Sequence, residues 1–200
     1  MRALIMAGGE GSRLNLGEKP LVTICGRPMI AYVISAFTGA GMEVVVIASP
    51  RTPMTQNWCR SNGVSVISAS GEGYVSDLVE AVGVLQETGP FFTSVSDLPC
   101  LEPDLIAAIH DAFTAAGTDA LSTWVPVQRC RAYDCRTRYV ETIGGENVCP
   151  AGVNILNGSR IEEEQEEHPL VLDDARLAFN INTREELAAA RSFLCPGRSD

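Results

Sequence analysis

The feature that most constrains the fold is a regular alternation of short apolar runs with longer amphipathic segments over the first 127 residues. The run at 3–6 is followed by glycines and is typical of a buried parallel strand. Further strands are predicted at 43–48, 64–68, 91–96 and 120–127, and helices at 28–40, 55–61, 74–86 and 103–116. Strands that alternate with helices predict an α/β fold, a Rossmann-like and mostly parallel sheet with helices on both faces.

The alternation stops after residue 127. Residues 129–149 lack long apolar runs and are rich in Arg, Cys, Tyr and Gly, so we expect a hairpin excursion that lies over the sheet. We expect another strand at 150–156, a solvated helix or loop at 162–167, and a last helix opened by Asn182-Thr183. A chain of 200 residues then forms one domain, 1–200.

The charge balance and the hydropathy pattern exclude two classes of partner. Fifteen basic against twenty-five acidic residues give a net charge of −10, which argues against nucleic-acid binding because phosphates are neutralised by clustered Lys and Arg. No apolar run approaches the ~20 residues that span a bilayer, and the first strand is too short for a secretory signal. We therefore expect a soluble, cytoplasmic protein without membrane insertion.

The seven cysteines form no Cys-x-x-Cys pair, and the chain has only two histidines, so a zinc site is not indicated. We expect reduced, structural thiols.

Lys19 is the one lysine in the chain, against fourteen arginines. Coding bias explains why lysine is rare, but it does not explain why this one remains. A compact ammonium can fit against a phosphate where a planar guanidinium cannot, which favours a site role for Lys19. Without a ligand, a loop lysine beside other cations is expected to contribute little to stability.

A glycine-rich loop follows the first strand and is the strongest site signal. Gly8, Gly9 and Gly11, with Ala7 and Ser12 among them, lie at the carboxyl edge of the predicted sheet, where ligands bind. Glycines let backbone N–H groups form an anion-binding nest, although a simple tight turn explains them too. Arg13 and Lys19 place two cations beside the loop. Together these residues predict a triphosphate site suited to a pyrophosphate leaving group.

Two other phosphate motifs do not fit this loop. A nucleoside triphosphatase P-loop requires a Gly-Lys pair, and the chain contains none, so no kinase activity is expected. A dinucleotide fingerprint requires a glycine where Leu14 stands and an acid near the end of the second strand, where Ala48-Ser49-Pro50 stand instead.

Asp97 directly follows the predicted strand at 91–96 and therefore faces the same edge as the glycine loop. A carboxylate there can hold Mg²⁺ against nucleotide phosphates. Its alternative role is to cap the following turn.

The loop and Lys19-Pro20 together resemble the nucleotidyltransferases that make nucleoside-diphosphate conjugates, the MobA-like enzymes with the nucleotide-diphospho-sugar transferase fold. Further motifs narrow the resemblance to the archaeal adenosylcobinamide-phosphate guanylyltransferases. These motifs are 3–9, Glu18-Lys19-Pro20-Leu21 with Cys25-Gly26-Arg27, Ser70-Gly71-Glu72-Gly73-Tyr74, Pro150-Ala151-Gly152-Val153-Asn154, and Asp173-Asp174 leading to Phe179-Asn180-Ile181-Asn182-Thr183.

The resemblance implies roles for several further residues. Asn182 would be a second metal ligand beside Asp97, with helix capping as its other role and Asn180 as the next choice for the ligand. The loop at 70–74 would take the nucleobase through Ser70, Gly71 and Gly73, unless it is a plain strand–helix turn. Gly152 and Asn180 would also contact the nucleotide, and Arg13, Lys19 and Asp97 would be the catalytic residues.

The reaction implied by the resemblance is transfer of GMP from GTP to adenosylcobinamide phosphate, with Mg²⁺, giving adenosylcobinamide-GDP and pyrophosphate in cobalamin biosynthesis. The guanine preference comes from the resemblance alone. Two alternatives stay open: guanylyl transfer to the molybdenum cofactor, and a nucleotide-binding module without catalysis. The sequence leaves the oligomeric state open, with a homodimer as one option.

Overall fold

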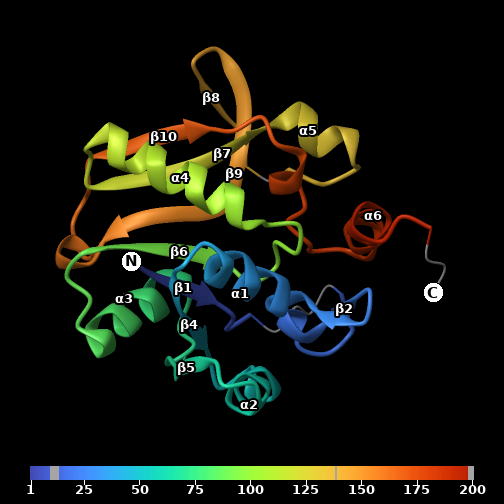
Figure 1. The fold of residues 1–200 in the computed structure, drawn as a ribbon, viewed down its shortest axis with the longest axis horizontal. Helices are drawn as coiled ribbons and strands as arrows, with labels where there is room; N and C mark the ends of the chain where they lie inside the picture. Colours follow the sequence, from blue (N-terminus) through green and yellow to red (C-terminus); the bar gives the residue numbers. More distant parts are fainter. Residues whose placement is uncertain (10–13, 138, 198–200) are drawn as a thin grey trace.

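A single large sheet organises the computed structural model, which describes residues 1–9, 14–137 and 139–197 (Figure 1). The strand order is β10-β7-β9-β6-β1-β4-β5, and β8 pairs with β9. The strands are β1 (Arg2–Met6), β4 (Glu43–Ala48), β5 (Ser65–Ser68), β6 (Pro90–Val95), β7 (Ala120–Pro126), β8 (Glu141–Ile143), β9 (Glu146–Asn157) and β10 (Glu167–Val171). A separate hairpin joins β2 (Thr23–Ile24) to β3 (Arg27–Pro28).

All the helices except one stand where the sequence predicts them. The helices are α1 (Met29–Gly39), α2 (Pro53–Ser61), α3 (Tyr74–Leu85), α4 (Pro103–Ala116), α5 (Val127–Ala132) and α6 (Arg184–Leu194), with 3-10 turns η1 (Lys19–Leu21), η2 (Gly158–Arg160) and η3 (Ala175–Ala178). The exception is α5, which lies where the end of a strand and a hairpin excursion are expected. Pro53 and Pro103 stand in the first turns of α2 and α4, where the missing N–H costs nothing.

Residues of β1 alternate between two buried clusters, which shows that both faces of the sheet are covered. Ala3 and Ile5 belong to a cluster that also holds side chains of α1, α4 and α6. Leu4 and Met6 belong to a second cluster, with Leu78, Ala81 and Val82 of α3. The predicted α/β architecture with helices on both faces is confirmed.

The register of the central strands brings three loops to one edge. Met6, the last residue of β1, pairs with Ile47 of β4 and with Val95 of β6, and all three strands run parallel. The segments that follow these strands therefore begin side by side. We call this edge the carboxyl rim.

The second half of the sheet departs from the expected pattern. β9 runs antiparallel between β6 and β7, and β8 forms a hairpin with its first residues. The predicted excursion at 129–149 is thus partly correct, because it begins with the end of α5 and only its later part is a hairpin. β10, which pairs parallel with β7, lies where no strand is expected. Its sequence, EHPLV, is polar and contains a proline, as an edge strand tolerates.

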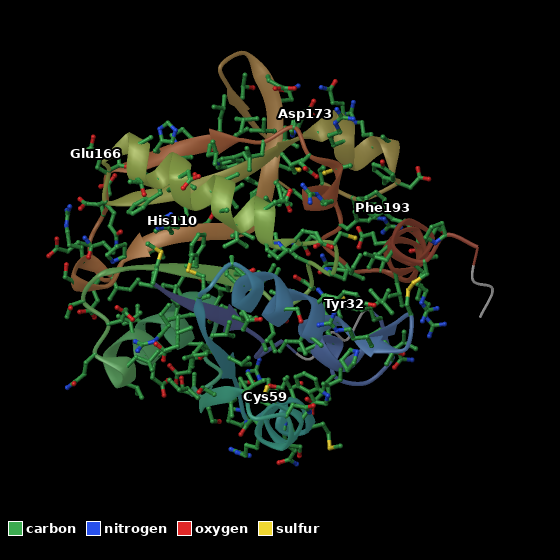
Figure 2. The ribbon with its side chains drawn as sticks, in the orientation of Figure 1. Tyr32, Cys59, His110, Glu166, Asp173 and Phe193 are labelled. Carbon is green, nitrogen blue, oxygen red and sulfur yellow. A yellow bond between two sulfur atoms is a disulfide. The ribbon has the colours of Figure 1, made fainter. Side chains whose placement is uncertain are left out.

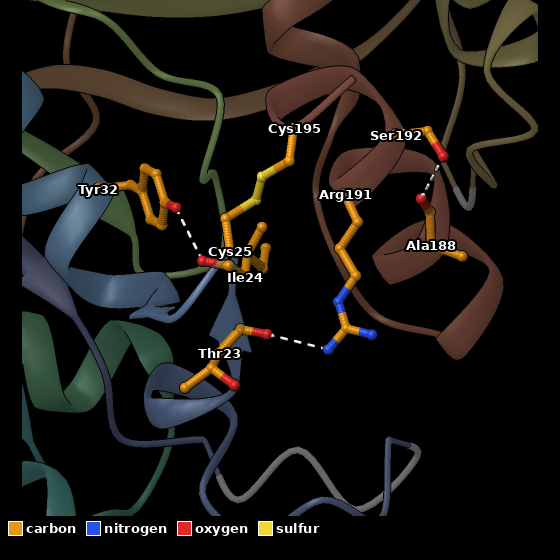
Figure 3. The surroundings of a disulfide bond; sticks show 8 residues. All are labelled: Thr23, Ile24, Cys25, Tyr32, Ala188, Arg191, Ser192 and Cys195. Carbon is orange, nitrogen blue, oxygen red and sulfur yellow. Dashed lines mark hydrogen bonds between the residues drawn. A yellow bond between two sulfur atoms is a disulfide. The ribbon is translucent and has the colours of Figure 1, made fainter. Parts of the chain in front are cut away.

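The prediction that the thiols are all reduced is wrong for two cysteines. Cys25, in the β2–β3 hairpin, and Cys195, at the end of α6, form a disulfide across 170 residues (Figure 3). Their Cα atoms lie 6.4 Å apart, within the range for disulfides. The fold creates this pair by docking α6 on the hairpin, where Arg191 also donates a hydrogen bond to the carbonyl of Thr23, 3.1 Å away. The five other cysteines are free and buried: Cys59, Cys100, Cys130, Cys135 and Cys149.

Within the described part of the chain, no helix is both long enough and apolar enough to cross a membrane.

Candidate functional site

A cavity of about 280 Å³ opens at the carboxyl rim, and we call it the first cavity. The glycine loop contributes Gly8 and Gly9, the next turn contributes Lys19, and the loop before α3 contributes Gly71 and Gly73. The structure therefore brings together segments that the sequence analysis proposed separately. Gly11, Ser12 and Arg13 lie outside the described residues.

Lys19 reaches the rim because the residue before it is anchored to α2. The Glu18 carboxylate accepts hydrogen bonds from the backbone N–H groups of Met54 (2.8 Å) and Thr55 (2.6 Å) and from the Thr55 hydroxyl (2.6 Å). These N–H groups belong to the first turn of α2, where a negative charge is favoured. Glu18 thus ties the turn that carries Lys19 to a rigid helix.

Lys19, Asp97 and Asn182 meet at the rim, and we call them the polar cluster. The Lys19 ammonium donates a hydrogen bond to Asp97 Oδ2 and another to Asn182 Oδ1, 2.9 Å away. The ion-paired side chains are only 13% (Lys19) and 12% (Asp97) exposed. The backbone carbonyl of Asp97 also accepts a hydrogen bond from the N–H of Ile181 (3.0 Å), so the two acceptors of the cluster are linked through the main chain.

Asn182 is free to join the cluster because it is not the helix cap. Thr183 caps α6: its hydroxyl accepts from the Glu186 N–H (3.2 Å), and the Glu186 carboxylate accepts from the Thr183 N–H (2.9 Å). The Asn182 side-chain amide donates to the Asn180 side-chain oxygen (2.9 Å), which orients the Asn182 oxygen toward Lys19. Asn180 therefore supports Asn182 in the structure.

Aromatic packing holds the segment that carries these asparagines. The centroid of the Phe179 ring, which is fully buried, lies 4.9 Å from that of Tyr133 and 4.7 Å from that of Phe193. Phe193 lies on α6 (Figure 2). Three mutually packed rings exclude water and fix the entry into α6. The asparagines that follow Phe179 are therefore held by the core.

Two oxygens of the polar cluster are suited to a hard cation. Asp97 Oδ1 is buried and has no hydrogen-bond partner among the described residues. A buried carboxylate oxygen without a partner is costly, and a ligand that supplies positive charge removes the cost. Asn182 supplies a neutral oxygen to the same cluster. One carboxylate with an amide oxygen, completed by substrate phosphates and water, is the type of donor set that Mg²⁺ uses.

The loop before α3 is held in shape by Asp77, which the sequence analysis missed. One oxygen of this buried carboxylate accepts from the N–H groups of Gly71 (2.8 Å) and Glu72 (3.2 Å). Gly71 and Gly73 both have positive φ, 81° and 137°, which a side chain would strain. The loop that carries Ser70, Gly71 and Gly73 is therefore a preformed wall beside the first cavity. An acid in the first turn of a helix resembles an ordinary helix-dipole partner, so its contacts could not be predicted.

Two other residues of the first cavity were also missed. Arg51 follows β4, and its guanidinium makes no ion pair with any described residue. Tyr74, at the start of α3, shares a hydrogen bond of 2.9 Å with the Thr93 hydroxyl. Burial raises the pKa of the Tyr74 phenol, and the charge of Asp97 raises it further. The position of Arg51 just after a parallel strand was the available signal.

Ala7, Gly152 and Asn180, three of the residues predicted to contact the nucleotide, do not line the first cavity. The N–H of Ala7 donates to the carbonyl of Ile47 (2.7 Å), so it is not free to join an anion-binding nest. Gly152 belongs to β9 and has a φ of 83°; a Cβ there would lie 2.8 Å from Val95, so glycine allows two strands to approach closely. Asn180 lines a different cavity, described below.

The fold and the rim site define a nucleotidyltransferase of the Rossmann-like type. Residues 3–196 match the family model of the MobA-like NTP transferase domain, and the chain belongs to this family. The resemblance seen in the sequence motifs is confirmed.

Curated relatives and solved structures agree with this assignment. The chain is 35% identical to adenosylcobinamide-phosphate guanylyltransferase from Methanocaldococcus jannaschii, over 97% of both chains. It is 30% identical to molybdenum cofactor guanylyltransferase from Cupriavidus metallidurans, over 92% of this chain and 91% of the relative. A hypothetical transferase from Thermus thermophilus has the same fold, with a TM-score of 0.72 at 17% identity, covering 94% of this chain and 100% of that one.

Proposed function

We propose that this protein transfers GMP from GTP to adenosylcobinamide phosphate, releasing pyrophosphate and forming adenosylcobinamide-GDP. The observation that carries the proposal is the polar cluster, in which Lys19, Asp97 and Asn182 meet beside a glycine-lined cavity. The relative at 35% identity over 97% of the chain supports this acceptor.

The first cavity is proposed to hold GTP. Gly8 and Gly9 offer backbone to the phosphates without side chains in the way, and Lys19 and Arg51 supply two positive charges. The loop held by Asp77 would take the guanine base against its backbone and short side chains, since the N–H groups of Gly71 and Glu72 already donate to Asp77. Arg13 is proposed as a further phosphate contact from its place in the motif.

Asp97 and Asn182 are proposed to hold Mg²⁺. When bound, the ion would neutralise phosphate charge near the α-phosphorus. Lys19 would then turn from Asp97 to the phosphates and stabilise the charge that develops as pyrophosphate leaves.

The chemistry needs no amino-acid nucleophile. The acceptor is a phosphate monoester, so one of its anionic oxygens attacks the α-phosphorus, and the bond from that phosphorus to the bridging oxygen of pyrophosphate breaks. No proton has to be removed from the attacking oxygen at neutral pH. Catalysis is then alignment and charge neutralisation. The two histidines agree with this: His110 lies on α4 (Figure 2) and His168 on β10, and neither lines the first cavity.

Guanylyl transfer to the molybdenum cofactor is the second candidate, because relatives with that activity match over more than nine-tenths of the chain. The test is pyrophosphate release with GTP and Mg²⁺ and each acceptor in turn. We expect release with adenosylcobinamide phosphate and little with the molybdenum cofactor. Pyrophosphate release with the molybdenum cofactor alone would assign the second function. No release with either acceptor would indicate a nucleotide-binding module without catalysis. We also propose a cytoplasmic location, where GTP is supplied.

A further inference from the structure

A second cavity, of about 210 Å³, lies beside the polar cluster on the far side of Asn182. Asn180, Asn182 and Thr183 contribute from the entry into α6, and Pro150 contributes from β9. Arg136 and Tyr139 contribute from the segment that the sequence analysis left without a function. The cavity is therefore built by the second half of the chain, whereas the first cavity is built by the first half.

The two cavities meet at a hydrogen bond. Lys19 lines the first cavity and Asn182 lines the second, and the Lys19 ammonium donates to the Asn182 oxygen across 2.9 Å. A group that enters the second cavity toward Asn182 thus approaches the place proposed for the nucleotide phosphates. In-line attack requires the acceptor to come from the side opposite the leaving group, and two cavities joined at one point allow this.

Arg136 gives the second cavity a cation that forms no ion pair with the described residues, and the nearby carboxylate whose charge it feels, Glu185, is exposed to solvent. Its guanidinium forms no hydrogen bond or ion pair with any side chain that the structure describes, and the residue is exposed. Its backbone is nevertheless fixed, because the Arg136 N–H donates to the buried Glu186 carboxylate, 3.0 Å away. A fixed backbone with an unpaired guanidinium fits the recognition of a phosphate, which arginine can bind in a bidentate manner.

The acid in the cavity does not cancel this attraction. Besides Arg136, the Glu186 carboxylate accepts hydrogen bonds from the N–H groups of Asn182 (2.6 Å) and Thr183 (2.9 Å). Three backbone donors occupy both of its oxygens and offset its charge. Glu185, the other acid that interacts with Arg136, is exposed and does not line the cavity, so the charge that faces an entering anion is the guanidinium of Arg136.

The size of the cavity limits what can enter. Pockets that enclose drug-sized ligands have volumes of roughly 300–1,000 Å³, so a cavity of about 210 Å³ admits a phosphate and a short linker but no macrocycle. Tyr139, which also lines the cavity, is 53% exposed. Its ring offers an apolar surface on which a bulky ligand can rest while the phosphate of that ligand reaches inward.

We propose that the second cavity binds the phosphate-bearing arm of the acceptor, that Arg136 holds this phosphate before attack, and that the corrinoid ring stays outside against Tyr139. This proposal rests on the proposed function, because it presupposes a phosphate-monoester acceptor.

The experiment compares the wild-type protein with Arg136→Ala and Arg136→Lys. Arg131→Ala is the matched control, since Arg131 is an exposed arginine of the same segment that does not line the second cavity. The rate of pyrophosphate release is measured against adenosylcobinamide phosphate at saturating GTP, and against GTP at saturating acceptor. Melting curves with a non-hydrolysable GTP analogue, with and without acceptor, report acceptor binding even in a variant that does not turn over.

We expect Arg136→Ala to raise the acceptor KM at least tenfold and to abolish the acceptor-dependent rise in melting temperature. Arg136→Lys should have a smaller effect, and the KM for GTP should stay within about twofold in both variants. An unchanged acceptor KM in Arg136→Ala, or an equal change in Arg131→Ala, overturns the proposal while leaving the proposed function intact. A wild-type protein that binds GTP but uses no acceptor overturns both.

Discussion

Removing the Lys19 ammonium tests the polar cluster through both stability and turnover. In the free protein the Lys19–Asp97 pair is nearly buried, with side chains 13% and 12% exposed, and Asn182 adds a second hydrogen bond. Breaking a fully buried pair costs 3–5 kcal/mol, and an exposed pair contributes about 0–1 kcal/mol. Because both side chains keep a small exposure, the pair lies between these limits, and we expect Lys19→Ala to cost about 1–2 kcal/mol. For a chain of this size that is a fall in Tm of roughly 2–8 °C.

The same substitution should reduce kcat/KM at least about tenfold, which corresponds to about 1.4 kcal/mol at the transition state. Lys19→Arg keeps the charge, but a planar guanidinium does not fit where a compact ammonium lies between Asp97 and Asn182. We therefore expect Lys19→Arg to lose at least tenfold as well, and Lys19→Ala to lose more.

Thermal unfolding without nucleotide and steady-state pyrophosphate release measure the two effects, with Arg131→Ala as the control for loss of one positive charge. Full activity in Lys19→Arg would show that any cation suffices at this position. Coding bias alone would then explain why the chain has a single lysine. An unchanged Tm in Lys19→Ala would refute the ion pair and restore the expectation, drawn from the sequence, that Lys19 contributes little to the fold.

Three further predictions concern the site, and a fourth concerns the buried thiol of Cys59 on α2. Asp97→Asn should fold, since an amide oxygen still accepts from Lys19, but lose most turnover and most dependence on Mg²⁺; unfolding with normal activity per folded molecule would make Asp97 a structural cap. GTP at 100 times its Kd should add about 2.7 kcal/mol and raise the Tm by roughly 5–10 °C, and equal shifts with ATP would refute the guanine preference. Asp77→Ala should weaken GTP binding about tenfold, because the Gly71 and Glu72 N–H groups lose their acceptor, and Asp77→Asn should weaken it less; equal effects would refute this role. Burial raises the pKa of the Cys59 thiol to about 11, so the contribution of this thiol to stability is complete below pH ~9 and is lost as the pH rises toward 11. Between about pH 9 and 11, urea unfolding should therefore show a smaller loss of stability in Cys59→Ala than in the wild-type protein.

Local pattern predicted the first half of the fold closely. The strand at 43–48 and the helix at 103–116 have the bounds that their apolar spacing indicates, because the strand is buried on both faces and the helix buries one continuous face. The place of β9 could not be predicted in this way. Its antiparallel insertion between β6 and β7 depends on contacts between segments far apart in the chain. β10 was not predicted for a different reason: it is an edge strand, and an edge strand needs no apolar run in its sequence.

The site shows the same division. Lys19, Asp97 and Asn182 could be proposed because each stands where ligands commonly bind. Lys19 lies in the loop after the first strand, Asp97 at the end of a strand and Asn182 just before the last helix. That they touch follows from the sheet register and from the packing of Phe179, which only the structure reveals. Glu18 and Asp77 act by accepting backbone N–H groups of other segments, and Cys25 and Cys195 pair across almost the whole chain. No local pattern marks such partners.

The most direct test of the central claim follows the label from two forms of GTP. The wild-type protein is incubated with Mg²⁺, adenosylcobinamide phosphate and GTP labelled at either the α- or the γ-phosphate, and the products are separated. We predict that the α-label appears in the corrinoid conjugate and the γ-label in pyrophosphate, in equal amounts. The γ-label in the acceptor would show a kinase, and both labels remaining in GTP, or appearing only in GDP and phosphate, would contradict guanylyl transfer.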